Sequence, residues 1–529
     1  MTTTDTLPPF ELQDANGDSH AFPTGGLTLL CFVKEDCPTC DMSMPLIEQV
    51  HRAYTDSVRV LCIGQDAPGN AVLVERHGLT MPMLDDSPLH TSYRYDLDTV
   101  PTVILADDAG RELSRFIGFG RDDWRQLVAN LAARTTLAEA DVDWDTYPEM
   151  LPGCGSKSVE PGIAERLEAE MDGSPLHARR IIIGERDDEA EFLFDQDLTD
   201  GLPVVPPTPE RVLRMLAGTK RDPQDEVAVV PPNMAPCTVE KVAINAVMAG
   251  CKPDYLPVVI AALEAACTDQ FNAHGVGATT MGGTPLMIIN GPIRQKLGMN
   301  MKLGALGQGN RANATIGRAL RLTLRNVGGQ VPGGTERSTL GNPMKFTMCF
   351  PEWEERSDWL PLHVERGFDK DDSVVTLFAA TGGPAQIVDQ ESRTARGVAG
   401  SLAARMNSLS HPRSRPLGDH VLVVCPEHLR TLTNEGWTKA DLRQHIYQQS
   451  SLPLRDVLAD EDGTGIPPKR FGPDGPPPDK LDDLIPKFQS PDHIHIVVAG
   501  SPAGMFSAMF EGWASGPIGS QPISRKIED

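Results

Sequence analysis

The stretch CFVKEDCPTC, residues 31–40, places an apolar run directly before a loop that carries two cysteines. It overlaps LTLLCFV, residues 27–33, whose continuous apolar run predicts a buried strand. The following MSMPLIEQVHRAY repeats apolar side chains at helical spacing and predicts a helix. Cys37 and Cys40 are therefore expected at a junction between a strand and a helix, with a spacing that suits dithiol redox chemistry.

The residues after this junction alternate between strand and helix patterns. VRVLCIG, residues 58–64, predicts a second strand, and AVLVERHG predicts a helix that Gly78 ends. TVPTVILADDAGREL, residues 99–113, predicts two strands joined by a turn at 108–110. RDDWRQLVANLAAR predicts a closing helix with one apolar face. The first part of the chain is thus expected to have an α/β fold.

This order of elements, with C-x-x-C before the first helix and Val100-Pro101-Thr102 downstream, resembles the thioredoxin fold. The opening PPFELQDANGDSH is similar to the hairpin entry of the thiol-disulfide oxidoreductase and peroxiredoxin-like branch. The resemblance spans residues 1–135, about a quarter of the chain. It implies a thioredoxin-like domain in which Pro101 is a cis proline that faces the two cysteines.

The chemistry expected at Cys37 follows from its place before a helix, where the helix dipole favours the thiolate. Cys37 would attack a substrate disulfide, and Cys40 would resolve the mixed disulfide. The substrate would be a small-molecule or protein disulfide, and an upstream thiol reductant would restore the dithiol. Asp36 stands where the family has tryptophan, and its charge is expected to raise the pKa of Cys37.

Two other interpretations of the cysteine pair stay open. A zinc site would need a second ligand pair, and the sequence has no other C-x-x-C. A packing domain without redox activity is the second alternative. Cys31 and Cys62 lie inside apolar strand patterns and are expected to be buried structural thiols.

Residues 136–190 are acidic and then rich in Pro, Gly and Ser, which predicts a linker or an ordered crossing segment with one short helix. Cys154 lies in this segment between two glycines, with Lys157 nearby. An exposed, acidified cysteine here would serve as an internal disulfide partner of the first domain. The alternative is a loop cysteine without a role.

Residues 191–529 are expected to form one larger α/β domain, possibly in two halves, with a parallel or mixed sheet covered on both faces. Thr208 and Thr238 are predicted helix caps. The patterns DHVLVVCPEHLRTL and HIHIVVAGSPAGMFSAMFEGW are each expected to be a strand, a loop and a helix. The Pro-rich residues 462–480 predict a lid-like insertion.

Two Gly-rich loops of this domain are candidate ligand sites. In the first, Gly307 and Gly309 precede Asn310 and Arg311 at a helix start, where N–H groups and the arginine would hold an anion. In the second, Gly500, Ser501 and Gly504 follow a strand, and suit a phosphate or carboxylate at the edge of the sheet. A turn that packs a helix is the favoured alternative for the first loop, and a plain turn between strand and helix is the favoured alternative for the second.

Cys237 is the cysteine of the second domain best placed for catalysis, because it precedes the predicted cap Thr238. His274 and His363 are candidate bases for it. His493 and His495 share one face of a strand but are expected to be core or edge residues. The sequence predicts no metal site and no cofactor.

The segments GNRANATIGRALRL and NGPIRQKLGMN resemble a widespread bacterial family of undefined activity. That family is associated with small proteins that carry a selenocysteine- or cysteine-Gly-Ser-Cys motif. The resemblance implies thiol or selenol redox chemistry and no particular substrate.

Composition limits the partners of the chain. The 529 residues are 40% hydrophobic and 23% charged, which is an ordinary globular balance. The net charge of −25 argues against nucleic acid as a partner. No apolar run reaches the length of a membrane span, and the opening residues lack the pattern of an export signal. The sequence therefore predicts a cytoplasmic protein with no membrane partner, and oligomers remain open.

Three functional hypotheses follow. In the first, the C-x-x-C domain supplies electrons to a fused α/β domain that carries out a thiol-dependent reduction or lyase reaction on a small anionic molecule. In the second, the protein is a redox-regulated binding protein. In the third, it is a general protein disulfide reductase whose second domain selects substrates.

Overall fold

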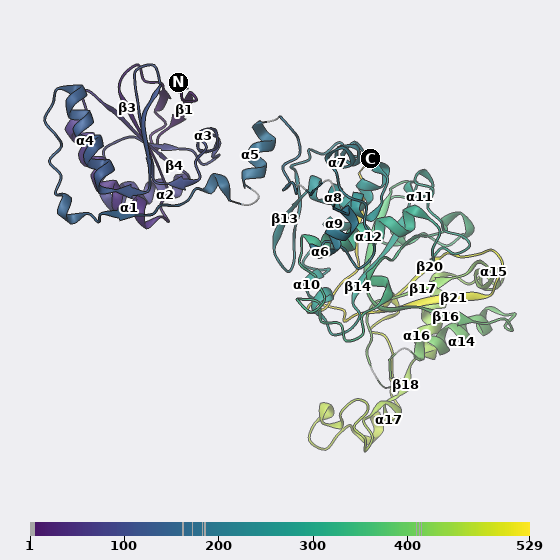
Figure 1. Cartoon of the computed structure of the whole chain (residues 1–529). Helices are drawn as coiled ribbons and strands as arrows, with labels where there is room; N and C mark the ends of the chain where they lie inside the picture. Colours follow the sequence, from purple (N-terminus) through teal and green to yellow (C-terminus); the bar gives the residue numbers. More distant parts are fainter. Residues whose placement is uncertain are drawn as a thin grey trace. The chain divides into compact units, whose positions relative to one another are not determined.

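The computed structural model describes residues 6–160, 163–171, 173–181, 183–184, 187–408, 410–411, 413 and 415–528, with the backbone alone at 165 and 169. The chain divides into two compact units, Met1–Ile181 and Ile182–Asp529. Figure 1 draws both. The first unit thus extends beyond the boundary predicted at residue 135, and much of the predicted linker belongs to it.

The first unit is built on a five-stranded sheet with strand order β5-β4-β3-β7-β8. β3, β4 and β5 are parallel, while β7 is antiparallel to β3 and to β8. This mixed sheet with helices along the chain is the thioredoxin fold that the sequence predicted. The elements are β1(Phe10–Gln13), β2(Ser19–Phe22), β3(Thr28–Val33), α1(Pro38–Tyr54), β4(Arg59–Gly64), α2(Ala67–His77), β5(Met83–Asp85), α3(His90–Arg94), β6(Thr99–Val100), β7(Thr102–Ala106), β8(Glu112–Ile117), β9(Phe119–Gly120), α4(Arg121–Thr135), β10(Met150–Leu151), β11(Cys154–Gly155) and α5(Ile163–Met171).

The core of the first unit explains why β3 lies at the centre of the sheet. All six residues of β3 are buried, since the strand has neighbours on both edges and helices over its faces. Cys31 and Cys62 are fully buried on adjacent strands, as predicted. The closing helix α4 contributes Trp124, whose ring packs edge-on against Phe116 at 5.3 Å between centroids. This packing joins α4 to β8 at the edge of the sheet.

The second unit has a mixed seven-stranded sheet with the order β15-β14-β16-β21-β17-β20, and β22 pairs with β16. β14 is parallel to β15, and β17 is parallel to β20, whereas the other pairs are antiparallel. The strands are β12(Glu226–Val230), β13(Ala235–Thr238), β14(Thr284–Asn290), β15(Cys349–Pro351), β16(Val374–Val388), β17(His420–Val424), β18(Leu452–Pro453), β19(Leu484–Ile485), β20(Ile494–Val498), β21(Phe506–Gly512) and β22(Ile523–Lys526).

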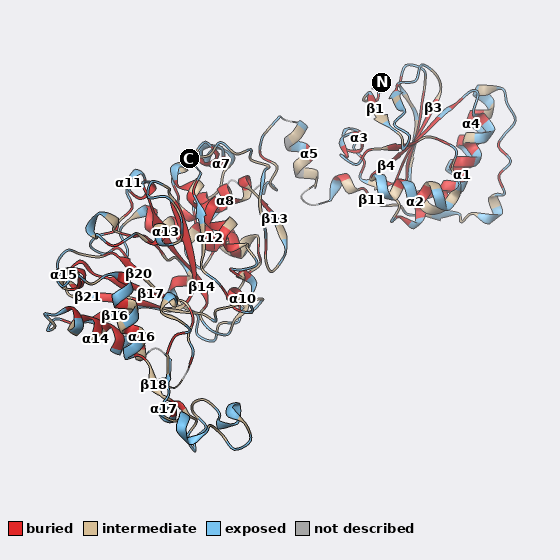
Figure 2. Ribbon diagram, turned by 180° about the vertical axis from the view of Figure 1, so that it is seen from behind, coloured by how far each residue is buried: buried red, intermediate tan, exposed pale blue. Residues whose placement is uncertain are grey.

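Helices cover this sheet on both faces. The helices α14, α15 and α16 share one apolar cluster with Leu422 and Val424, whereas Val421 and Val423 face a second cluster on the opposite side. Figure 2 shows the buried residues of α8 and α12 beside β14. The helices are α6(Glu189–Asp195), α7(Pro209–Leu216), α8(Val239–Ala249), α9(Leu256–Ala266), α10(Ala273–Ala278), α11(Ile293–Lys296), α12(Arg311–Asn326), α13(Leu362–Glu365), α14(Ala395–Asn407), α15(Pro426–Asn434), α16(Lys439–Gln449) and α17(Leu454–Val457).

One predicted element of the second unit is wrong. The segment MFSAMF was expected to be helical, but it forms β21, which pairs with both β16 and β17. Pairing with two neighbours outweighs the high helix propensity of Met and Ala. Strand β16 begins at Val374 and runs through the Thr-Gly-Gly-Pro stretch. It continues to Val388 through a shift of register between Ala380 and Ala385.

Other local predictions are confirmed. Thr208 is the residue before α7 but makes no side-chain capping hydrogen bond there, whereas Thr238 caps α8 by accepting a hydrogen bond from the Lys241 N–H. The Pro-rich insertion forms only short 3-10 turns, and Figure 1 shows it projecting with α17 and β18 from the rest of the second unit. Among the described residues no single helix has the length and apolarity of a membrane span, and only the bent pair 239–249 and 253–266 meets that test jointly.

The burial of Trp124 gives a stability prediction for the first unit. Trp124→Ala removes a fully buried aromatic ring and should lower the free energy of unfolding by about 3–5 kcal/mol. Urea-dependent alkylation of Cys31 and Cys62 would report this shift, while Cys349 would report the second unit. Leu137→Ala, at an exposed position, is the matched control and should change little. Equal midpoints for the two variants would contradict the packing role of Trp124.

Candidate active site

Cys37 lies where the buried strand β3 gives way to helix α1. It is the N-cap of α1, and Pro38 begins the helix with a fixed backbone angle. The backbone N–H of Cys40 donates to Cys37 Sγ at 3.4 Å. The sulfur is therefore held at the positive end of the helix dipole, as the sequence predicted. Cys40 lies one turn further on, fully buried.

The loop opposite the cysteines carries Val100 and Pro101. The Val100–Pro101 peptide bond is cis, as the resemblance to the thioredoxin fold implies. Cys37 Sγ lies 3.5 Å from the Val100 carbonyl oxygen. Val100 thus belongs to the immediate surroundings of the reactive sulfur.

Cys154 lies beside Cys37, although the sequence assigned it to a linker. Strand β11 pairs antiparallel with β6, and this pairing aligns Cys154 with Val100. The Cys154 side chain is close enough to Cys37 to lower the pKa of that thiol. The hydroxyl of Thr39 donates to the Pro152 carbonyl oxygen at 2.7 Å. The structure therefore brings together four of the predicted catalytic residues, namely Cys37, Cys40, Pro101 and Cys154.

The three cysteines differ in acidity. Hydrogen bonding from Cys40, which outweighs burial, and from Cys154 and two backbone N–H groups lowers the pKa of Cys37 to about 5. Burial, and then the neighbouring Cys37, raise the pKa of Cys40. The pKa of Cys154 is raised because its thiol proton is held by Cys37. Cys37 is consequently the thiolate among the three cysteines. Cys40 and Cys154 keep their protons.

The predicted effect of Asp36 on Cys37 is not observed. The Asp36 side chain is 62% exposed and forms a salt bridge with Lys34 at 3.4 Å. Water and the lysine screen its charge, so the hydrogen bonds to Cys37 dominate and the pKa falls rather than rises.

Cys237 does not have the acidity that its position in the sequence predicted. It is fully buried in β13, and burial raises its pKa to about 12. The helix dipole of α8 does not offset the loss of water around the sulfur. Neither candidate base is among its polar contacts, and His363 belongs to a separate cluster. Cys237 is therefore a structural thiol.

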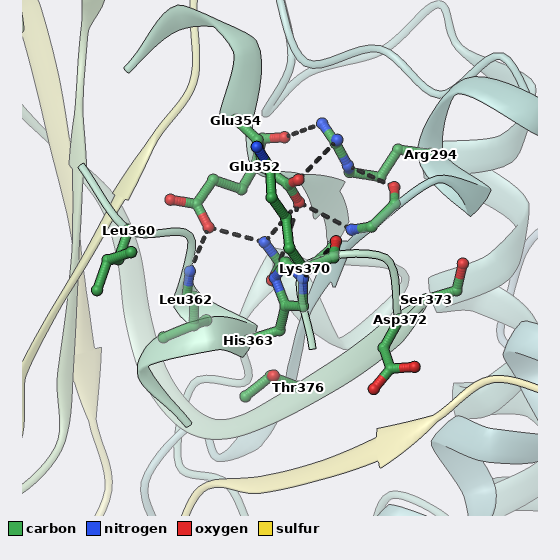
Figure 3. Close-up of polar contacts among 12 residues, drawn as sticks. Arg294, Glu352, Glu354, Leu360, Leu362, His363, Lys370, Asp372, Ser373 and Thr376 are labelled. Carbon is green, nitrogen blue, oxygen red and sulfur yellow. Dashed lines mark hydrogen bonds and ion pairs between the residues drawn. The ribbon is translucent and has the colours of Figure 1, made fainter. Parts of the chain in front are cut away.

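His363 lies in a buried polar cluster at the ends of β14 and β15 (Figure 3). Its Nε2 is 3.3 Å from the Lys370 carbonyl oxygen, and its Nδ1 is 3.9 Å from Glu354. Glu352 accepts from the Leu362 N–H, and Arg294 pairs with Glu354. Because buried charges here meet opposite charges or N–H donors, the cluster is best explained as a connection between loops.

The two predicted Gly-rich ligand loops are only partly brought together. Gly307 and Gly500 line one cavity of about 200 Å³ with apolar neighbours such as Val423 and Phe506. Gly309 lies at a left-handed backbone position before α12, whose first turn is capped by Asn310 through the Asn313 N–H. These contacts favour the interpretation of this loop as a turn that packs a helix.

In the second loop, a carboxylate of the protein itself already accepts a hydrogen bond from the backbone. The Gly504 N–H donates to the Glu427 carboxylate at 3.0 Å, and Ser501 accepts from the Ala503 N–H. No helix follows the loop, since β21 begins at Phe506. The predicted phosphate site at Gly500, Ser501 and Gly504 therefore lacks both the helix and the open donors.

Arg311 instead faces a basic cavity of about 340 Å³ between α7, the end of α8 and the start of α12. Its guanidinium also donates to the Gly250 and Cys251 carbonyl oxygens. Three further cations, Arg211, Arg214 and Lys252, line the same cavity. Among the described residues none of the four belongs to a salt bridge, which distinguishes this cavity in a protein of net charge −25.

Sequence reasoning missed one cysteine and histidine pair. Cys425 is the N-cap of α15, and His428 lies one turn on, with its Nδ1 2.7 Å from the Ser507 hydroxyl. Burial raises the pKa of Cys425, but His428 and Ser507 outweigh burial and the net pKa is lowered. The motif C-x-x-H at a strand end was the available signal. Both side chains are buried.

The described residues contain no group of three or more His, Cys, Asp or Glu side chains placed to hold a metal ion. His495 binds Asp419 at 2.7 Å, and His493 contacts Ser490.

Comparisons with known proteins place the N-terminal region among thiol-disulfide proteins. No protein-family model matches the chain. The chain is 29% identical over 106 residues to a thiol-disulfide oxidoreductase ResA of Halalkalibacterium halodurans, covering 19% of this chain and 60% of that protein. It is 29% identical over 110 residues to the ResA protein of Geobacillus kaustophilus, covering 20% and 63%. The chain thus spans about three fifths of these relatives.

Solved structures match the same N-terminal region of the chain. StoA from Bacillus subtilis is 22% identical, with a TM-score of 0.21, covering 22% of this chain and 96% of StoA. Peroxidoxin BcpB from Mycobacterium tuberculosis is 19% identical, with a TM-score of 0.23, covering 25% and 97%. The sequence matches support thiol-disulfide oxidoreductase chemistry for the N-terminal unit and say nothing of the second unit.

The acidity of Cys37 gives a pH prediction. The thiolate absorbance of the reduced protein should show a transition near pH 5 that Cys37→Ser removes. This pKa lies below the value of about 8.5 for an unstructured thiol. Ionisation of Cys37 therefore contributes its full stabilisation of the reduced fold above about pH 8.5, the pKa of the unfolded thiol. This stabilisation is lost as the pH falls through 5. Cys154→Ala should move the transition upward, because a hydrogen bond to the sulfur is lost. A transition near pH 8 in the unaltered protein would refute this assignment.

Proposed function

We propose that the protein is a dithiol-disulfide oxidoreductase whose second unit binds a small anionic molecule and uses the electrons that Cys37 and Cys40 supply. The observation that carries the first half is the acid thiolate of Cys37, with the protonated thiol of Cys40 one turn away. A thiolate that forms below neutral pH attacks disulfides readily and also leaves readily from a mixed disulfide.

The difference between the two thiols assigns their roles. Cys37 is the attacking sulfur because it is ionised and faces the Val100 edge. Cys40 is buried beneath it and stays protonated until a mixed disulfide forms on Cys37. Once Cys37 is consumed in that bond, its charge disappears and one cause of the raised pKa of Cys40 disappears with it. Cys40 can then attack and release the substrate thiol.

The basic cavity supports the second half of the proposal. Four cationic side chains surround a space of about 340 Å³, which suits a phosphate- or carboxylate-bearing molecule of modest size. Glu210 is an acidic neighbour of Arg211, so the remaining three cations carry most of the expected attraction. We place the thiol-dependent reduction or lyase reaction in this unit, and the covalent link raises the effective concentration of the electron donor.

The redox half is tested on the full chain. In a thiol-disulfide buffer, the unaltered protein should form a Cys37–Cys40 disulfide that is detected by mass spectrometry of non-reduced peptides. Cys37→Ser should abolish the reduction of a small disulfide by at least a hundredfold, because the attacking thiolate is lost. Cys267→Ser is the matched control, since Cys267 is partly buried with a pKa of about 12. Undiminished reduction by Cys37→Ser would overturn the redox assignment.

The binding half has its own test. Calorimetric titration of the full chain with inorganic phosphate and with citrate should show binding that weakens as salt rises. Arg214→Ala and Lys252→Ala should each weaken it about fivefold, the effect of roughly 1 kcal/mol per charge. Lys469→Ala, an exposed cation on the Pro-rich insertion, is the control and should leave binding unchanged. If neither anion binds, or if all three variants bind alike, the cavity is not an anion site.

A further inference from the structure

Residues 150–155 lie along the site as an added strand. β10 pairs with β9, and β11 pairs with β6. Both pairings are antiparallel, and the second sets Cys154 opposite Val100, the residue whose carbonyl faces Cys37. Thr39, on the first turn of α1, donates to Pro152. The segment thus occupies the exposed edge where an extended substrate would add its own strand.

The segment fits closely, and glycine is required for that fit. A Cβ on Gly153 would lie 2.4 Å from the Thr99 side chain and 2.5 Å from the Val100 carbonyl oxygen. Gly118 also faces the segment, and a Cβ there would lie 2.9 Å from the Leu151 carbonyl oxygen. By contrast, a Cβ on Gly155 would meet nothing within 4 Å. The approach is closest one residue before the cysteine.

The chain after Cys154 is fixed by buried hydrogen bonds. The Gln65 amide donates to the Ser156 hydroxyl at 2.6 Å and accepts from the Lys157 N–H at 2.9 Å. Ser158 donates to the Leu97 carbonyl oxygen, and Lys157 forms a salt bridge with Asp66. Ser156 and Ser158 are buried. The position of Cys154 is therefore set by strand pairing on one side and by these anchors on the other.

We propose that Cys154 is the built-in exchange partner of Cys37, and that electrons leave the Cys37–Cys40 dithiol through Cys154 to a small-molecule disulfide. This inference rests on the proposed dithiol chemistry of Cys37 and Cys40. Cys37 has two thiol neighbours, Cys40 beneath it and Cys154 beside it, and only Cys154 is partly exposed. Cys154 is therefore the one of the two that an external molecule reaches.

The exchange balances without any further reactant. The Cys154 thiol, after losing its proton, attacks a small disulfide and releases one thiolate, so that Cys154 carries the other half. The Cys37 thiolate attacks the Cys154 sulfur, forms the Cys37–Cys154 disulfide and releases the second thiolate. Cys40 then loses its proton and attacks Cys37, which forms the Cys37–Cys40 disulfide and regenerates Cys154. Two electrons pass from the dithiol to the small disulfide, and two thiols leave.

The test uses the full-length Cys40→Ser protein with glutathione disulfide. We expect two glutathione molecules released per chain and a Cys37–Cys154 linkage in the non-reduced peptides. Cys40→Ser with Cys154→Ser should instead stop after one release, with glutathione retained on Cys37. Cys40→Ser with Cys267→Ser is the matched control and should still form the internal linkage. Persistent glutathione on Cys37 of Cys40→Ser, with no linkage to Cys154, would overturn the inference.

The outcome separates this inference from the proposed function. If the unaltered protein forms the Cys37–Cys40 disulfide while Cys40→Ser never links Cys37 to Cys154, only the built-in partner fails. If neither disulfide forms, the dithiol chemistry fails as well.

A second variant tests the position of the segment. Gly153→Val should force the strand away from Val100, and alkylation of Cys37 by a bulky maleimide should accelerate at least tenfold. Gly155→Val is the control, because its side chain enters open space and should leave the rate unchanged. Equal rates for the two variants would show that the strand does not cover Cys37.

Discussion

The hydrogen bond from the Cys40 N–H to Cys37 Sγ is the interaction on which the site depends. It exists because a fully buried strand ends at the first turn of α1, so that the sulfur takes the place of a capping oxygen. The same turn places Cys40 beneath Cys37 and turns the Thr39 hydroxyl towards Pro152. One local geometry thus favours the thiolate of Cys37, buries Cys40 beneath it and holds one end of the segment that carries Cys154.

That geometry also determines which substrates can reach Cys37. The Val100 edge can accept only one strand, and residues 154–155 occupy it. A foreign protein would have to displace a segment fixed by the buried Gln65 and Ser156 contacts before it reached Cys37. Selectivity of this kind needs no loss of reactivity in the thiolate. It argues against a general protein disulfide reductase and in favour of a donor that serves small molecules and its own chain.

The sequence predicted the features that local chemistry decides. Cys37 before a helix, Gly78 at the end of a helix and Thr238 as a cap are set by a few neighbouring residues. The pairing of Cys154 with Val100 could not be predicted, because no pattern in a Pro- and Gly-rich segment specifies its distant strand. The prediction that Cys237 is a catalytic cysteine was wrong for a related reason. Its position before a helix was correct, but burial, which depends on the whole second unit, outweighs the dipole.

The charge of the protein affects which molecules can take part in the two proposed activities. A protein with a net charge of −25 repels anionic molecules at long range, but salt at physiological strength limits that repulsion to about 8 Å. Within that distance the local charges decide which molecules bind. Arg214, Lys252 and Arg311 therefore control their cavity even though the protein as a whole is acidic. The same reasoning applies to Cys154, whose pKa Lys34 and Asp36 shift in opposite directions. Because these charges oppose each other, we expect the proposed exchange thiol to favour neither anionic nor cationic disulfides strongly, and we propose that discrimination among anions depends on the basic cavity of the second unit.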